Sequence, residues 1–300
     1  MIDSSTKEEV LIEALPYIQT YEGKTFVIKY GGAAMTEERL KQTFAKDVTI
    51  LRKIGVNIVI VHGGGKEITD AAKAFGIETT FVDGQRYTDE RMMDVVLMML
   101  AGKLNKQIVH LVNLNGGNAV GLCGVDNMLL KAKKQTRNGV DLGLVGEITS
   151  VNIPFVNLLL QNGMMPVIAP IGVGENGQTF NINADLAAGA IASALRAEKL
   201  VYLSDIEGIL VNRKLVSTLT KSEAAKMMQE GSIFGGMIPK VTSAFETLEA
   251  GVSKVHIIDG RIKHSLLLEI FTDEGIGTQM IHEDGDPPAS ETGVSRKANV

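Results

Sequence analysis

Short β-branched runs alternate with longer segments of helical period along almost all of the 300 residues. Alternation of this kind is typical of βαβ units, in which helices cover a mainly parallel sheet. We therefore predict an α/β fold with a mainly parallel, open sheet. The predicted strands cover residues 25–30, 57–62, 167–171, 200–205 and 254–259, and the predicted helices cover residues 37–54, 66–75, 89–109, 185–194 and 239–250.

Three segments depart from this pattern. Ser5 and Glu8 have the spacing of a capping box, which predicts an N-terminal amphipathic helix, bent near Pro16. Its apolar stripe could pack on its own domain or on another subunit. Glycines, asparagines and short strand-like pieces between residues 113 and 147 predict hairpins. The polar C-terminal tail, which contains two prolines, is predicted to be disordered.

The chain has no linker rich enough to separate independent domains. Glycines and polar residues at 172–179 nevertheless interrupt two α/β halves, so we place a boundary near Gly174. Four parts follow from it: the N-terminal helix (1–24), a first lobe (25–173), a second lobe (174–282) and the tail (283–300).

Composition argues against several classes of partner. A net charge of −5 and a pI near 5.6 give no reason to expect nucleic acid, because nucleic-acid binders usually carry a basic face. The first residues are acidic where a secretory signal is basic, and apolar runs stay far below the roughly 18 residues that cross a bilayer. The single cysteine, Cys123, cannot form an internal disulfide. We expect a cytoplasmic protein without a membrane span.

Glycines follow the first two predicted strands. Lys29-Tyr30-Gly31-Gly32 ends the first strand, and His62-Gly63-Gly64-Gly65 ends the second. Glycine lets backbone N–H groups approach an oxyanion closely, and the N-terminus of a following helix adds positive charge. Tight turns would explain either pair alone, but two pairs at successive strand ends favour a ligand crevice. Neither segment matches the P-loop or the dinucleotide fingerprint.

Polar side chains gather at three further positions. Arg86, within Gly84-Gln85-Arg86-Tyr87-Thr88-Asp89, offers a planar fork for a carboxylate, or is a surface arginine beside a helix cap. In Asn181-Ile182-Asn183-Ala184-Asp185 the two asparagines alternate as in a strand, so both amides are expected on one side, with Asp185 opening the next helix. Ser204 and Asp205 end another strand.

Lys240 is predicted at the start of a helix, after Gly235-Gly236-Met237-Ile238-Pro239. A lysine in that place opposes the helix dipole unless an anion joins it. The position therefore favours a bound phosphate over simple exposure.

Taken in order, these segments resemble the amino acid kinase family over residues 25–281. The resemblance implies a three-layer αβα sandwich and ATP-dependent phosphoryl transfer. It is strongest to the members that phosphorylate the side-chain carboxylate of N-acetyl-L-glutamate, the committed step toward arginine.

The same resemblance implies residue roles. Lys29 and Lys240 would grip the transferring phosphoryl group, and Asp185 would hold both lysines in place. The first lobe would bind the acyl substrate and form a dimer, whereas the second would bind the nucleotide. Mg²⁺ would sit on the ATP phosphates without a dedicated protein metal site. The implied substrate-binding residues are Gly64, Gly65, Arg86, Asn181 and Asn183, and the implied nucleotide-binding residues are Lys29, Gly31, Gly32, Ser204, Asp205 and Lys240.

Two segments resemble the arginine-inhibited members. In those members an N-terminal helix interlaces dimers into a hexamer, a trimer of dimers, which favours packing of residues 1–24 on another subunit. In the second segment Glu269 could pair with an arginine guanidinium, and the turn at Gly275 and Gly277 could receive its carboxylate. The implied arginine-binding residues are His256, Glu269, Gly275 and Gly277. Some relatives in photosynthetic organisms also bind a PII-type signalling protein, but no feature of this sequence confirms a binding surface for it.

Other interpretations stay open. The nearest are other members of the family, such as carbamate, glutamate, aspartate or uridylate kinases. Arg86 argues for a substrate with an α-carboxylate. A non-catalytic arginine-sensing protein is a different class, which the presence of Lys29, Asp185 and Lys240 makes less attractive. A nicotinamide dehydrogenase would need the missing dinucleotide fingerprint.

Overall fold

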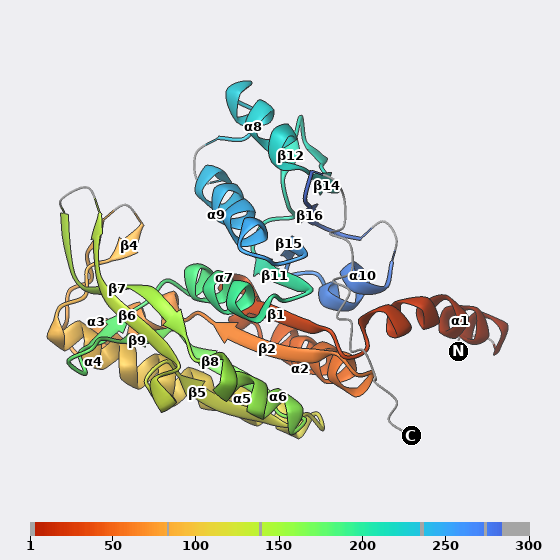
Figure 1. The fold of residues 1–300 in the computed structure, drawn as a ribbon. Helices are drawn as coiled ribbons and strands as arrows, with labels where there is room; N and C mark the ends of the chain where they lie inside the picture. Colours follow the sequence, from red (N-terminus) through yellow and green to blue (C-terminus); the bar gives the residue numbers. More distant parts are fainter. Residues whose placement is uncertain (1–3, 83, 138–139, 235–236, 273–274, 284–300) are drawn as a thin grey trace, which may run out of the picture.

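The computed structural model describes residues 4–82, 84–137, 140–234, 237–272 and 275–283. An eight-stranded sheet forms the centre of the molecule (Figure 1). Six strands run parallel, and the two strands at one edge run antiparallel to them. In spatial order the strands are β14 (Thr218–Leu219), β16 (Thr278–Met280), β15 (Lys254–Asp259), β11 (Lys199–Ser204), β1 (Thr25–Tyr30), β2 (Asn57–His62), β8 (Met165–Ala169) and β5 (Ala119–Cys123).

The central strands are covered on both faces. In β1, Phe26, Val27 and Ile28 are all fully buried, although their side chains alternate between the two sides of the sheet. Such continuous apolar runs are typical of parallel strands between helical layers. The sheet therefore separates two apolar cores, each packed against its own layer of helices.

Helices form the outer layers of this sandwich (Figure 1). The predicted three-layer α/β fold is thereby confirmed. One layer contains α2 (Glu38–Lys53), α3 (Gly65–Ala74), α4 (Glu90–Leu97), the π-helix η2 (Met98–Leu104), α5 (Asn105–Leu114) and α10 (Ser265–Phe271), and the other contains α6 (Ile153–Gln161), α7 (Ala184–Leu195), α8 (Lys221–Gln229) and α9 (Met237–Glu249). Helix α1 (Ser4–Tyr21) extends to one side, where Tyr17 packs edge-on against Phe271.

Smaller sheets extend from the sandwich. The long hairpin of β6 (Leu130–Arg137) and β7 (Val140–Val151) closes a small barrel with β9 (Ile171–Val173) and β10 (Thr179–Asn181). This confirms the hairpins predicted for the middle of the chain. The remaining short elements are the hairpins β3 (Phe81–Val82) with β4 (Gln85–Arg86) and β12 (Leu210–Val211) with β13 (Lys214–Leu215), and the 3₁₀ turns η1 (Gly32–Met35) and η3 (Asp126–Met128).

Several predicted boundaries need correction. The strand expected at 167–171 breaks at Pro170, which has no N–H to donate to a ladder, and the chain continues as β9 in the barrel. The helix expected at 89–109 runs on to Leu114 through the π-helical segment. Helix α1 begins at Ser4 and is continuous through Pro16. The predicted disordered tail lies outside the described residues from position 284 onward, and the domain boundary at Gly174 stays a prediction.

The segment Glu90–Leu114 is the one described helical stretch that is long and apolar enough to cross a bilayer, with a mean hydropathy of 1.3. Its inward face belongs to the core: Met92, Val96, Leu104 and Val112 are all at least 95% buried. Core helices of globular proteins often meet the same length and hydropathy criteria, so this stretch is weak support for a membrane span.

Candidate active site

Two lysines converge on one carboxylate at the carboxyl end of the parallel strands. Lys29 lies near the end of β1, and its Nζ is 3.0 Å from Asp185 Oδ1. Lys240, in the first turns of α9, places its Nζ 3.8 Å from Asp185 Oδ2. The three side chains are 15%, 37% and 32% exposed, so they line an open crevice rather than a closed core. The arrangement holds two positive charges side by side with one negative charge between them.

Asp185 owes its place to the start of α7. The N-cap is Asn183, whose Oδ1 accepts hydrogen bonds from the N–H groups of Asp185 and Leu186 at 2.8 and 3.2 Å. The helix cap therefore lies two residues before Asp185, which was expected to open the helix, because Asn183 and Asp185 are both residue types that suit a cap. Once Asn183 caps the helix, Asp185 in the first turn is free to face the lysines.

The two glycine segments lie against each other beside this carboxylate. The N–H of Gly63 donates to the carbonyl of Tyr30 at 2.8 Å. Lys29 folds back over Gly31 so closely that a Cβ there would lie 3.0 Å from its Nζ. Position 63 also approaches α7, since a Cβ on Gly63 would lie 3.9 Å from that of Ala184. The absence of side chains thus lets two strand ends, a helix N-terminus and Lys29 meet at one point.

Arg86 is 7% exposed, so the interpretation as a surface arginine was wrong. Its Nη2 donates to the carbonyl of Gly65 at 2.8 Å and to Thr69 Oγ1 at 2.9 Å, and its guanidinium stacks over Phe81 at 4.8 Å. Nη1 is buried without a partner among the described residues. Burial lowers the pKa of Arg86 from its ordinary value. An unsatisfied buried guanidinium nitrogen is suited to an anionic ligand.

The two asparagines do not act as the predicted same-face pair. Asn181 ends β10 and donates from Nδ2 to Thr88 Oγ1 at 3.1 Å, whereas Asn183 is engaged with its own helix. Thr88 in turn donates to the carbonyl of Arg86 at 2.9 Å. Asn181 is therefore linked to the Arg86 segment through Thr88. The helix cap in that segment is Asp89, whose Oδ1 accepts from the N–H of Met92 at 2.7 Å.

A pocket of about 160 Å³ joins these elements. It brings Gln85 from the β3–β4 hairpin to the same space as Asp185 and Lys240. Tyr202 forms part of its wall and was missed in the sequence. Its hydroxyl lies 3.4 Å from the carbonyl oxygen of Asp185, and burial followed by the nearby Asp185 charge raises its pKa.

A second cavity of about 370 Å³ adjoins the end of β11. Asp205 lies at this cavity, and the neighbouring Ser204 Oγ lies 3.4 Å from Asp205 Oδ1. Arg261 also faces the cavity and pairs with the buried Asp259 at 2.7 Å. The apolar residues at the cavity are Ile206, Ile209, Leu210, Ile233, Phe234 and Met237. Within the described parts of the chain, no three His, Cys, Asp or Glu side chains are grouped to hold a metal ion.

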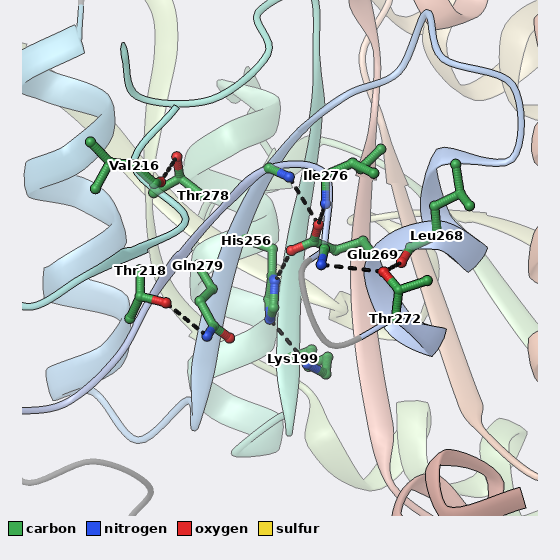
Figure 2. Close-up of polar contacts among 12 residues, drawn as sticks. Lys199, Val216, Thr218, His256, Leu268, Glu269, Thr272, Ile276, Thr278 and Gln279 are labelled. Carbon is green, nitrogen blue, oxygen red and sulfur yellow. Dashed lines mark hydrogen bonds and ion pairs between the residues drawn. The ribbon is translucent and has the colours of Figure 1, made fainter. Parts of the chain in front are cut away.

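The predicted arginine segment contains a buried polar chain (Figure 2). Lys199 Nζ lies 3.1 Å from His256 Nε2, and His256 Nδ1 lies 2.6 Å from Glu269 Oε1. Burial, followed by the Lys199 charge, lowers the pKa of His256 to about 4, so the neutral ring accepts from Lys199 and donates to Glu269. Burial opposes ionisation of Glu269, yet the hydrogen bonds from His256 and two backbone amides hold its pKa below the ordinary value.

The turn in this segment is not free for a ligand carboxylate, contrary to our expectation. The N–H groups of Ile276 and Gly277 donate to Glu269 Oε2 at 2.7 and 3.0 Å, and the N–H of Gly275 donates to Thr272 Oγ1 at 3.2 Å. Glu269 is 8% exposed and needs these donors, because a buried carboxylate is costly when it is unpaired. Both of its oxygens are therefore engaged.

Paired lysines beside glycine-rich strand ends place positive charge and backbone N–H groups together, an arrangement that suits the charge on a transferring phosphoryl group. The comparisons agree, since residues 24–259 match the amino acid kinase family. The acetylglutamate kinase of Chlorobaculum tepidum is 55% identical over 286 residues, which cover 95% of this chain and 100% of that protein. The acetylglutamate kinase of Syntrophobacter fumaroxidans is 52% identical and covers 92% of this chain and 96% of its own.

Solved structures show the same architecture. An N-acetylglutamate synthase from Neisseria gonorrhoeae, complexed with coenzyme A and N-acetyl-glutamate, superposes with a TM-score of 0.81 at 28% identity. The match covers 91% of this chain and 63% of the synthase, so our chain spans less than two thirds of that protein. Carbamate kinase from Giardia lamblia, bound to AMP-PNP, shares the fold with a TM-score of 0.61 at 20% identity. The chain belongs to the amino acid kinase family and is a phosphotransferase.

Proposed function

We propose that the protein transfers the γ-phosphoryl group of ATP to the side-chain carboxylate of N-acetyl-L-glutamate, which yields N-acetyl-L-glutamyl 5-phosphate and ADP for arginine biosynthesis. The observation that carries this proposal is the pair Lys29 and Lys240 on Asp185, beside a pocket in which Asp185 and Lys240 meet Gln85, the neighbour of Arg86 in the chain. The similarity to enzymes named acetylglutamate kinase supports it.

Arg86 is the proposed site for the α-carboxylate of the substrate. Its Nη2 is already bound to Gly65 and Thr69, so the guanidinium is held in one orientation while Nη1 has no partner among the described residues. A carboxylate that accepted from Nη1 would satisfy a buried donor, which is worth about 1.5–3 kcal/mol for a charged hydrogen bond. Asn181 and Asn183 are the proposed contacts of the neighbouring polar groups.

The chemistry requires no general base. A side-chain carboxylate with an ordinary pKa of about 4 is ionised near pH 7, so one of its oxygens can attack the γ-phosphorus directly as the bond to the ADP oxygen breaks. Negative charge then spreads over the transferring group. Lys29 and Lys240 would stabilise that charge from two sides, and Asp185 would hold both lysines in place. The N–H groups of Gly64 and Gly65 would add neutral donors.

ATP fits the second lobe in this proposal. The cavity beside Ser204 and Asp205 has mainly apolar side chains and about 370 Å³, which suits a nucleoside, and Met237 at the cavity begins the helix that carries Lys240. Gly31 and Gly32 would face the phosphates. Mg²⁺ would bind the phosphate oxygens and neutralise part of their charge. Residues 25–173 would then carry the acyl substrate, and residues 174–282 the nucleotide.

Steady-state kinetics with a panel of acceptors tests the proposal. ADP release with MgATP should require N-acetyl-L-glutamate, and glutamate, aspartate or carbamate should give kcat/KM at least about a hundredfold lower, because they lack the group or length that both ends of the site recognise. Preference for another acceptor would reassign the enzyme within its family. No turnover with any acceptor would favour the non-catalytic arginine sensor.

We also propose that arginine inhibits the enzyme at the Lys199–His256–Glu269 chain. This chain lies beside α1, since Lys199 Nζ is 5.0 Å from the ring of Tyr21. A guanidinium would have to replace the amide donors of Glu269, so binding would open the turn at Gly275–Gly277. Millimolar arginine should lower the parent rate but not that of Glu269→Gln. Equal inhibition of both would remove Glu269 from the site.

The N-terminal helix supports a proposed hexamer of three dimers. Ile12 and Leu15 on α1 are 63% and 51% exposed, and an apolar stripe of this kind can be covered by a second subunit. Multi-angle light scattering should give six chains for the parent and two for a chain that begins at residue 24. Binding of a PII-type protein stays an expectation from the resemblance.

A further inference from the structure

A buried polar network joins β2, β5 and β8. Its centre is Asn105, the first residue of α5, which is completely buried. Asn105 Nδ2 lies 3.3 Å from His62 Nε2, 3.2 Å from the carbonyl of Leu122 and 2.8 Å from the carbonyl of Val167. The amide group of Asn105, which lies 43 residues after His62 in the chain, thus contacts all three strands.

His62 passes this restraint on to the glycine loop. Its Nδ1 lies 2.9 Å from the carbonyl of Gly63, and since a carbonyl can only accept, Nδ1 carries the hydrogen and Nε2 accepts from Asn105. His62 is completely buried, and burial lowers its pKa to about 4, so the ring is neutral near pH 7. One tautomer satisfies both contacts.

The orientation of the Gly63 carbonyl determines that of the next N–H. In a planar trans peptide the C=O and the following N–H point in opposite directions, and the chain has no cis peptide in its described parts. The hydrogen bond from His62 therefore aims the Gly64 N–H away from the imidazole. Successive glycines restrain a peptide unit weakly, so this bond helps to fix its direction.

The same helix also packs on the loop. The segment before Asn105, Met98–Leu104, is π-helical, an irregularity that is frequent at functional sites. Its side chains approach Gly64 so closely that a Cβ there would collide with Leu104 and lie 2.9 Å from Leu100. Apolar packing and the Asn105–His62 contact thus act on the same peptide.

We propose that Asn105 and His62 are positioning residues for the phosphoryl transfer, because together they set the direction in which the Gly64 N–H donates. This inference rests on the proposed function of the glycine loop. Neither side chain needs to touch the substrate. Loss of the network should therefore lower kcat with N-acetyl-L-glutamate and leave the KM for MgATP nearly unchanged.

Substitution of Asn105 tests the first contact. Asn105→Ala should lower kcat about tenfold or more, which is less than the effect of removing an oxyanion donor itself. The KM for MgATP should stay within about twofold of the parent value. The matched control is Asn113→Ala. Asn113 lies on the same helix and bonds to Ala119 at 2.7 and 3.0 Å, away from the loop, so its loss should preserve kcat.

Substitutions of His62 separate positioning from packing. The amide nitrogen of an asparagine falls near the place of imidazole Nδ1, whereas that of a glutamine falls near Nε2. His62→Asn can still donate to Gly63 and should retain more kcat than His62→Gln, although glutamine is closer to histidine in size. The opposite order, or a kcat for Asn105→Ala within threefold of the parent, would overturn the proposal.

Hydrogen–deuterium exchange distinguishes failure of this inference from failure of the proposed function. A peptide that covers residues 62–66 should exchange faster in Asn105→Ala than in the parent or in Asn113→Ala, whichever acceptor the enzyme uses. A parent that phosphorylated no carboxylate would refute the proposed function and with it the catalytic part of this inference. Unchanged exchange in an active enzyme would refute the positioning alone.

Discussion

Removal of either lysine should disable phosphoryl transfer without unfolding the protein. Lys29 and Lys240 lie 3.0 and 3.8 Å from Asp185, so each is a donor already in place before charge develops on the phosphoryl group. Loss of one preorganised donor costs about 10²–10³ in kcat, or about 2.7–4 kcal/mol. We expect Lys29→Ala at the upper end, because Lys29 is 15% exposed and Lys240 is 37% exposed, and charge is less screened in the more enclosed position.

The assay is kcat at saturating MgATP and N-acetyl-L-glutamate, with melting temperature measured beside it. The matched control is Lys66→Ala. Lys66 lies in the first turn of α3, next to the glycine loop, but its side chain is 71% exposed and pairs with Asp70. Its removal should change kcat less than threefold. A change below threefold in Lys29→Ala or Lys240→Ala would refute the role assigned to that lysine.

Three further results are expected. Arg86→Gln should raise the KM for N-acetyl-L-glutamate about tenfold to a hundredfold, because a charged hydrogen bond is lost, and should change the KM for MgATP little. Equal effects on both KM values would contradict the carboxylate site. Gly64→Ala should lower kcat at least tenfold, because its methyl group collides with a leucine side chain of the π-helical segment, and full activity would show that the loop does not approach the substrate. Stability should fall by roughly 2 kcal/mol between pH 7 and pH 5, as measured by urea unfolding. The folded pKa values of His62 and His256 lie near 4, below the unfolded value of 6.5, so the unfolded chain takes up protons first as the pH falls. Burial raises the pKa of Asp47 to about 6, which opposes part of this loss of stability. A stability that rose toward pH 5 would contradict the assignment.

The central strands could be predicted from sequence because burial on both faces leaves an uninterrupted apolar run. Residues 25–30, 57–62 and 254–259 match β1, β2 and β15 at both ends. The antiparallel edge was not foreseen. Strand β16 has three residues and β14 two, which is too short for a periodic pattern.

Prediction of the candidate site from the sequence has the same limit. Lys29, Asp185 and Lys240 stand out at predicted strand and helix ends, so their convergence follows from topology. The contact between His62 and Asn105 depends on where the π-helical segment places the Asn105 side chain, and no local sequence pattern predicts that position. Glu269 was expected to pair with an arginine guanidinium, but its own turn surrounds it, since a buried carboxylate needs the nearest backbone donors.

The most direct test of the central claim is to identify which oxygen accepts phosphate. The parent enzyme is incubated with MgATP and N-acetyl-L-glutamate, hydroxylamine traps the acyl phosphate, and mass spectrometry locates the hydroxamate. We expect the side-chain hydroxamate alone, because Arg86 would hold the α-carboxylate away from Lys29 and Lys240. Formation of the α-hydroxamate, or ADP release without any hydroxamate, would contradict it.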